Sequence, residues 1–124
     1  MAHRRVRITA GAVHVTATLN DSETAGLVWD ALPFEAAAGT WGDEIYFAIP
    51  VEADEEQAVE VVAMGAVAYW PPGSALCLFF GPTPMSRGEE IRPASAVNIL
   101  GSIDGDSTVL KQVGPGERIV VEAM

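Results

Sequence analysis

Cysteine, histidine and basic residues are scarce in this chain. A single cysteine, Cys77, excludes an internal disulfide, and two histidines are too few for a typical zinc site without help from carboxylates. Seven lysines and arginines stand against seventeen aspartates and glutamates, and the formal charge of −10 disfavours binding to a phosphate backbone. The composition therefore predicts neither a bound metal nor a nucleic-acid partner.

Long hydrophobic runs are also missing. No apolar stretch approaches the roughly 20 residues that cross a bilayer. The first ten residues lack the apolar segment of a signal peptide, because Val6 and Ile8 alternate with Arg7 and Thr9. We therefore expect no membrane association and a cytoplasmic location. With 124 residues, 49% of them apolar, the chain is expected to form one domain over residues 1–124.

The motifs of common catalytic and nucleotide-binding sites are absent. No Gly-x-Ser-x-Gly elbow, Ser-x-x-Lys pair or phosphate-binding glycine loop occurs, so no cofactor is expected. Cys77 alternates with leucines and is expected in the core, and His14 is expected on the solvent side of its strand. Asp43 and Glu44 are adjacent, so in a strand they would point to opposite faces. We expect this acidic pair to serve a turn and the surface.

What the chain does contain is a series of short segments typical of strands. Apolar and polar residues alternate over 6–9 and 13–19, which predicts an N-terminal hairpin. Further strands are expected over residues 34–37, 43–49, 66–70, 75–80, 96–103 and 118–122. The Pro71–Ser74 segment is a defined turn, because proline fixes its own φ and glycine permits unusual ones. The strands that flank it should be antiparallel neighbours.

Helical spacing is confined to short segments. A helix is predicted over residues 22–32, after a segment, Asn20–Glu23, that resembles an N-cap box. A second helical segment is expected over 107–113. Residues 51–64 form either a loop with a helical turn or a strand. Residues 81–93 contain three prolines and two glycines, which predicts a long surface loop and makes it the prime candidate for specificity.

The number of strands bears on the architecture. A flat sheet of about eight short strands leaves two exposed edges, and closing the sheet on itself removes them. The apolar stripe of the helix at 22–32 must also be buried against this sheet. The sequence therefore predicts a mainly β protein, a closed antiparallel β-barrel of about eight strands with one or two capping α-helices.

Aromatic residues and arginines gather around the glycines and prolines. About half of these aromatics are expected in the core, and the rest to line an apolar groove that binds a peptide or a small organic molecule. Asn98 lies within an apolar strand and is either a satisfied buried amide or a donor in the groove. The expected ligand-binding residues are Trp41, Tyr46, Trp70, Phe79, Phe80, Met85 and Asn98.

Four sequence blocks carry a resemblance to the small cyclophilin-like proteins of bacteria and archaea. They are Thr40–Phe47, Tyr69–Gly73, Ala75–Ser86 and Ile91–Asn98. The resemblance implies a barrel of eight antiparallel strands with helices at its ends. Cyclophilins isomerise X-Pro bonds with an arginine beside an apolar proline pocket. By this resemblance, Arg87 and Arg92 of the long loop are the candidate catalytic residues.

Three functions follow as hypotheses. The first is a binding module that holds a peptide or a small organic ligand in the aromatic groove. The alternative is a peptidyl-prolyl cis-trans isomerase of weak or altered activity. The third is a structural subunit of a protein assembly, because exposed aromatic residues also mark protein interfaces. The oligomeric state is left open by the sequence, and a homodimer is one of the options.

Overall fold

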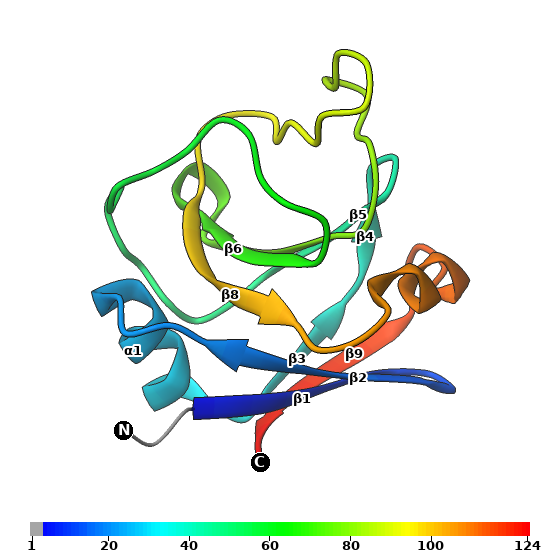
Figure 1. The fold of residues 1–124 in the computed structure, drawn as a ribbon. Helices are drawn as coiled ribbons and strands as arrows, with labels where there is room; N and C mark the ends of the chain where they lie inside the picture. The colour runs from blue at the N-terminus through cyan, green and yellow to red at the C-terminus, as the bar shows by residue number, and fades with distance from the viewer. Residues whose placement is uncertain (1–3) are drawn as a thin grey trace.

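The strands form one antiparallel sheet that curls into a nearly closed barrel (Figure 1). The structure is a computed structural model that describes residues 4–124. Within that range the strand order is β3-β9-β1-β2-β8-β6-β7-β5-β4. The strands are β1 (Arg4–Ala10), β2 (Val13–Leu19), β3 (Phe34–Ala37), β4 (Gly39–Thr40), β5 (Glu44–Ala48), β6 (Ala66–Trp70), β7 (Ala75–Phe79), β8 (Asn98–Ile103) and β9 (Arg118–Ala123). The predicted mainly β fold and its antiparallel barrel are confirmed.

The barrel closes through one chain segment that changes partners. Strand β3 pairs with β9. Strand β4, separated from β3 only by Ala38, pairs with β5 at the other end of the strand order. Between them, the Ala38 N–H donates to the Glu117 carbonyl (2.8 Å) and the Ala38 carbonyl accepts from the Gly116 N–H (2.8 Å). If β3 and β4 are counted as one strand, the barrel has eight. Gly39 begins β4.

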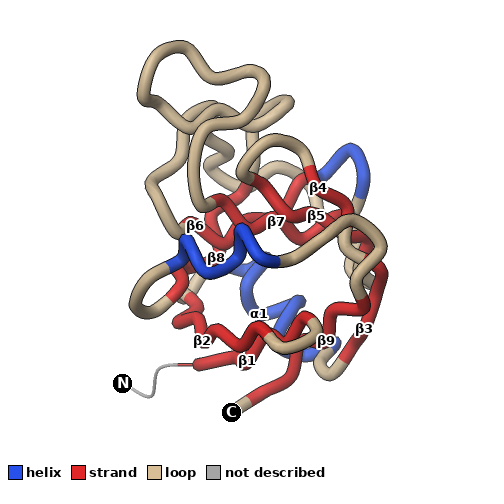
Figure 2. Tube along the Cα trace, turned by 90° about the vertical axis from the view of Figure 1, so that its right-hand side faces the viewer, coloured by secondary structure: helices blue, strands red, loops and turns tan. Residues whose placement is uncertain are grey.

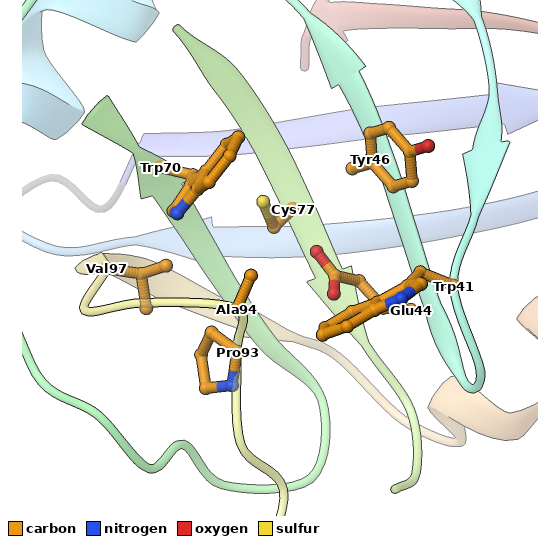
Figure 3. Close-up of a pocket in the computed structure, with 8 residues that line it drawn as sticks. All are labelled: Trp41, Glu44, Tyr46, Trp70, Cys77, Pro93, Ala94 and Val97. Carbon is orange, nitrogen blue, oxygen red and sulfur yellow. The ribbon is translucent and has the colours of Figure 1, made fainter. Parts of the chain in front are cut away.

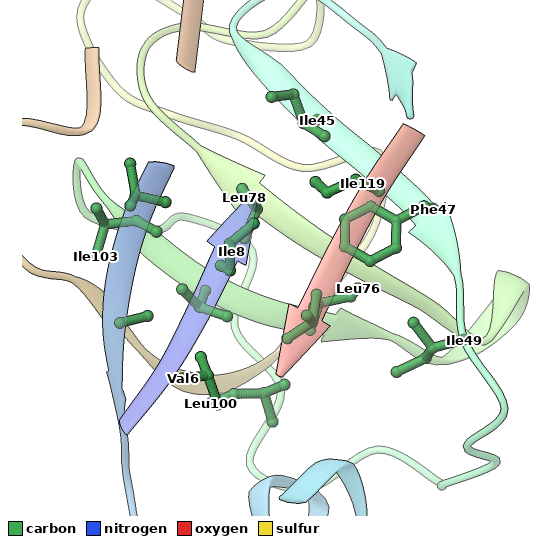
Figure 4. Packing of buried hydrophobic residues seen from close by; sticks show 14 of the residues in the cluster. Val6, Ile8, Ile45, Phe47, Ile49, Leu76, Leu78, Leu100, Ile103 and Ile119 are labelled. Atoms are coloured by element: carbon green, nitrogen blue, oxygen red, sulfur yellow. The ribbon is translucent and has the colours of Figure 1, made fainter. Parts of the chain in front are cut away.

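The barrel interior is filled by alternate residues of each strand (Figure 4). Ile45 and Phe47 of β5 face inward, and so do Leu76 and Leu78 of β7, because successive strand residues point to opposite faces. The predicted N-terminal hairpin is confirmed, since β1 pairs with β2 in antiparallel register from Arg4↔Leu19 onward. This interior cluster is the main hydrophobic core.

Two helical segments lie on opposite sides of the barrel (Figures 1 and 2). They are the α-helix α1 (Glu23–Ala31) and the 3₁₀ helix η2 (Ser107–Gln112). Both add apolar side chains to the main core, among them Val28 and Leu110. The helix cap is Ser22, whose hydroxyl accepts from the Ala25 N–H (3.2 Å). Among the described residues, neither segment has the length and apolarity needed to cross a bilayer.

The outer face of β6 and β7 is buried as well, under two long loops. Ala68, Cys77 and Phe79 point away from the barrel interior and form a second hydrophobic cluster with loop residues. Residues 51–64 form a loop rather than a regular strand, joined by isolated bridges that pair Val59 with Val97 and Val62 with Ile91. The predicted loop over 81–93 is present. The loops therefore build a second layer outside the barrel.

Candidate functional site

A cavity of about 240 Å³ opens in this second layer, on the outer face of β5, β7 and β6 (Figure 3). It lies outside the barrel, because β1 and β2 pass behind the strands that form its floor. Its lining is mostly aromatic and aliphatic. The lining residues are Trp41, Glu44, Tyr46, Trp70, Cys77, Pro93, Ala94 and Val97.

The strand register places the floor of the cavity. Tyr46 of β5 lies directly opposite Cys77 of β7, and Cys77 lies opposite Ala68 of β6. The small side chains of Cys77 and Ala68 leave the hollow open. Glu44 precedes Tyr46 by two residues, so both side chains leave β5 on the same face. One carboxyl group therefore reaches into an otherwise apolar floor.

The Tyr46 and Trp41 rings form one side of the cavity. Tyr46 pairs with Gly39 across β4 and β5, and a Cβ at Gly39 would lie 2.6 Å from the tyrosine ring. The glycine is therefore needed for the ring to lie flat over β4. Trp41 occupies the tip of the same hairpin, where its backbone N–H donates to the Glu44 backbone carbonyl (3.0 Å). Both rings are held by the β4–β5 hairpin.

The Trp70 ring forms the opposite side. It packs over the Pro71–Gly73 turn, where a Cβ at Gly73 would lie 2.7 Å from the ring. Its indole Nε1–H donates to the Ser95 Oγ (2.7 Å), which fixes the ring from the loop side. The turn that was predicted from the two prolines therefore positions an aromatic wall.

The loop that closes the cavity is braced from within. The Ser86 hydroxyl accepts from the N–H groups of Thr83 (2.9 Å) and Arg92 (3.1 Å), and the Thr83 hydroxyl donates to the Arg92 carbonyl. Further along, Val97 exchanges two backbone hydrogen bonds of 2.9 Å with Val59. Pro93 and its neighbours are thus held at a fixed place over the strands.

Glu44 is the polar centre of the cavity. Its side chain is almost fully buried, with 6% of the residue exposed. Within residues 4–124, its carboxyl group forms no ion pair with a basic side chain, and the Cys77 thiol lines the same cavity. Burial raises the pKa of Glu44 to about 7, against a smaller opposing effect of that thiol. This carboxyl group exchanges its proton near neutral pH.

Cys77 is held in the thiol form. Burial raises the pKa of Cys77 well above its ordinary value, and the neighbouring Glu44 raises it further. A nucleophilic cysteine needs a lowered pKa and some exposure, whereas Cys77 is 2% exposed. The expectation that Cys77 is a buried apolar group agrees with this geometry, although the thiol also forms part of the cavity floor.

The structure brings together three of the expected ligand-binding residues and separates the others. Trp41, Tyr46 and Trp70 surround the cavity. Phe79 and Phe80 do not reach it, which corrects the expectation, because Phe79 is buried in the second cluster and Phe80 in the barrel core. Two bulky residues in sequence at the end of β7 point to opposite faces, and each face is covered.

Met85, Arg87 and Arg92 lie together in a neighbouring hollow beyond Pro93 and Ala94. The Arg92 guanidinium donates to the Glu90 carboxylate (Nε–Oε2, 2.6 Å) and approaches the Glu60 carboxylate at 3.8 Å. Glu90 and Arg92 therefore satisfy each other, and the pKa of Glu90 is lowered as a result. Neither arginine lines the aromatic cavity.

Asn98 is a satisfied buried amide and does not line the aromatic cavity. Its Nδ2 donates to the Asp54 carbonyl (2.9 Å) and the Thr24 hydroxyl (3.2 Å), and its Oδ1 accepts from the Glu56 N–H (2.8 Å). The Glu56 carboxylate in turn accepts from the first N–H groups of α1, those of Glu23 and Thr24. Asn98 therefore ties the 51–64 loop and the helix to β8.

Glu44 is the polar lining residue of this candidate site that the sequence did not lead us to expect. The expectation that the Asp43–Glu44 pair serves the surface is wrong for Glu44, which lies under the loops. A signal was present, because an acid two residues before Tyr46 in the same strand must share its face. Among the described residues, no group of three or more potential ligand side chains is arranged to hold a metal ion.

Comparison with known proteins places the chain in a family. A family model described as cyclophilin-like matches residues 4–122. The chain belongs to the cyclophilin-like family. This cyclophilin-like protein is also similar to a hypothetical protein from Archaeoglobus fulgidus, known from a solution structure. The two are 44% identical, the match covers 98% of this chain and 95% of that one, and the TM-score is 0.84. No curated protein matches.

The family match confirms the resemblance that the four sequence blocks carried. It extends over nearly the whole chain and includes every strand of the barrel except the last residue of β9. The archaeal protein is described only as hypothetical. The function of this cyclophilin-like protein must therefore be argued from its own site.

Proposed function

We propose that this cyclophilin-like protein is a binding module that holds a small organic ligand in the aromatic cavity. The observation that carries the proposal is the convergence of Trp41 and Tyr46, from the β4–β5 hairpin, and Trp70, from the end of β6, on one open hollow. Concave, mostly apolar sites with a few placed polar groups are the usual form of small-molecule sites. Glu44 supplies the polar group here.

The rigidity of the walls supports binding. The Tyr46 and Trp70 rings pack on glycines, and the Trp70 Nε1–H is bonded to the loop that carries Ser95. A site that is already formed loses little conformational freedom when a ligand enters. The volume of about 240 Å³ favours a small molecule or a single side chain over an extended peptide.

Catalysis receives less support from the same geometry. Cys77 stays protonated, which argues against covalent chemistry at the thiol. An isomerase mechanism of the cyclophilin kind would need an arginine beside the apolar pocket, and Arg92 lies in the adjoining hollow, bonded to Glu90. We therefore favour binding over prolyl isomerisation.

Tryptophan fluorescence provides a direct test of the proposal. Two of the three tryptophans line the cavity, and the third, Trp29, belongs to α1. In a Trp29→Phe background, a bound ligand should change the emission of Trp41 and Trp70. A fragment library would be screened by this emission and by ¹H–¹⁵N NMR shifts.

A matched pair of variants locates the binding. Ala94 is exposed at the cavity mouth, so Ala94→Phe should fill the hollow without disturbing the core. Met85→Phe adds an aromatic ring in the neighbouring hollow and serves as the control. Fragments that bind the parent and Met85→Phe but not Ala94→Phe support the proposal. If no fragment shifts resonances around the cavity, the proposal is refuted.

A further inference from the structure

We infer that the ligand is a small organic cation, an alkylated or methylated ammonium held among the aromatic rings with the Glu44 carboxylate as its counter-ion. The inference rests on the proposed function and names its ligand class. It starts from Glu44, the charged residue of the cavity lining. Buried carboxylates are almost always paired with a cation or several donors.

Glu44 lacks such a partner within the described residues. Two half-buried carboxylates, by contrast, have one: Asp43 lies 4.0 Å from the Lys111 ammonium, and Glu90 forms an ion pair with Arg92. In residues 4–124, no basic side chain lines the cavity that Glu44 faces. Burial without a counter-charge is costly unless a ligand supplies the charge or a proton does.

The aromatic rings select the kind of cation. Figure 3 shows the Glu44 carboxylate beside Cys77, with Trp70 and Tyr46 on either side of the thiol and Trp41 next to the carboxylate. The faces of tryptophan and tyrosine rings carry negative potential and attract ammonium groups, most strongly when the cation is desolvated. Two tryptophans and a tyrosine around one carboxylate form a suitable cage.

The remaining lining argues for alkyl substituents on the cation. Pro93, Ala94 and Val97 offer aliphatic surface and no oxygen ligand from their side chains. A metal ion or a bare ammonium would lose its water here without replacement, because Mg²⁺ and Ca²⁺ require six or more oxygen ligands. An alkylated ammonium places methyl or methylene groups against these walls. The net charge of −10 further raises the local concentration of cations.

Binding of a cation should be linked to release of the Glu44 proton. The titratable groups that line the cavity with this carboxyl are the Tyr46 hydroxyl on the same strand and the Cys77 thiol on β7, whose pKa is raised by burial. Asp43, the preceding residue, is offset by Lys111. Because only the ionised carboxylate attracts a cation, affinity should rise as the pH increases from about 5.5 to 8.

The test compares a cation with a neutral molecule of the same shape. Binding of tetramethylammonium, choline and benzyltrimethylammonium is measured by calorimetry at pH 5.5 and 8, beside 3,3-dimethylbutan-1-ol, the uncharged isostere of choline. Glu44→Gln removes the charge with little change in shape. Asp43→Asn removes the same charge one residue away, outside the cavity lining, and is the control.

We expect at least one cation to bind at pH 8, with roughly tenfold weaker binding to Glu44→Gln and less than a twofold change in Asp43→Asn. Equal binding of choline and its isostere, or unchanged cation affinity in Glu44→Gln, would overturn the cation inference and leave the binding module intact. Failure of every cation to bind also overturns it, whereas only an empty fragment screen refutes the binding module itself.

One further arm distinguishes the source of the ammonium group. A short peptide with a blocked trimethyllysine presents the same chemistry as choline on a protein side chain. Tighter binding of the peptide, with NMR shifts of the residues around the cavity, assigns the site to a modified protein. Tighter binding of the free cations assigns it to a metabolite. Binding of neither class is the failure described above.

Discussion

Replacing Glu44 with glutamine is expected to stabilise the protein at pH 8 and to have a much smaller effect at pH 5. The carboxyl group is buried and its pKa is raised from 4.5 to about 7 in the folded state. Folding therefore favours the protonated form of this side chain. Stability from Glu44 is fully present below the unfolded-state pKa near 4.5 and is lost as the pH rises through about 7.

The magnitude follows from the two pKa values. Each pKa unit corresponds to about 1.4 kcal/mol, so the ionised Glu44 lowers the free energy of unfolding by about 3 kcal/mol once the pH is well above 7. Between pH 5 and 8, the wild type should lose about 2 to 3 kcal/mol relative to Glu44→Gln. Glutamine has nearly the same shape as glutamate and carries no titratable proton, so position 44 should contribute no pH dependence to the stability of the Glu44→Gln protein.

Urea unfolding of both proteins, followed by tryptophan fluorescence at pH 5, 6, 7 and 8, measures this difference. Every titratable group other than Glu44 is common to both proteins, so its contribution cancels in the comparison. Asp43→Asn is the control and should show no such pH-dependent gain. A difference between Glu44→Gln and the wild type that stays constant from pH 5 to 8 would mean that Glu44 is hydrated and titrates normally.

Two further predictions concern residues around the cavity. Asn98→Ala should lower the free energy of unfolding by about 2 to 4 kcal/mol, because it leaves the partners of three hydrogen bonds unsatisfied. The control Gln112→Ala, at an exposed position, should lower it by less than about 0.5 kcal/mol. Denaturant curves measure both changes, and the ligand affinity of the folded Asn98→Ala protein should be unchanged. Cys77 should react with a thiol reagent only upon unfolding, since burial and Glu44 keep it a protonated thiol; rapid labelling of the native protein at pH 8 would contradict this assignment.

Much of the barrel could be predicted because its signals are local. Alternation of apolar and polar residues predicted the N-terminal hairpin, and the Pro71–Ser74 turn predicted the pairing of β6 with β7, which the structure confirms. The helix predicted over 22–32 from its apolar spacing corresponds to α1, although its N-cap is Ser22 rather than Asn20. These features depend on neighbours in sequence, which is why one chain is enough to predict them.

The site could be predicted only in part, because it depends on which face of a strand lies under a loop. Every residue of β7 is buried, so its sequence does not distinguish the barrel interior from the second layer. Phe79 and Phe80 were therefore placed in a groove that Cys77 occupies instead. Glu44 was missed for the same reason, since the loop that buries it lies about fifty residues further along the chain.

The segment in which β3 becomes β4 joins the integrity of the barrel to the occupancy of the cavity. The same short stretch closes the cylinder at Ala38 and supplies, at Gly39, the surface on which the Tyr46 ring rests. Local opening of the hydrogen bonds at Ala38 would therefore also displace the cavity wall formed by Tyr46. A bound ligand would stabilise the closed barrel against this local opening. The amide of Ala38 would then exchange its hydrogen more slowly as the ligand concentration rises above the dissociation constant.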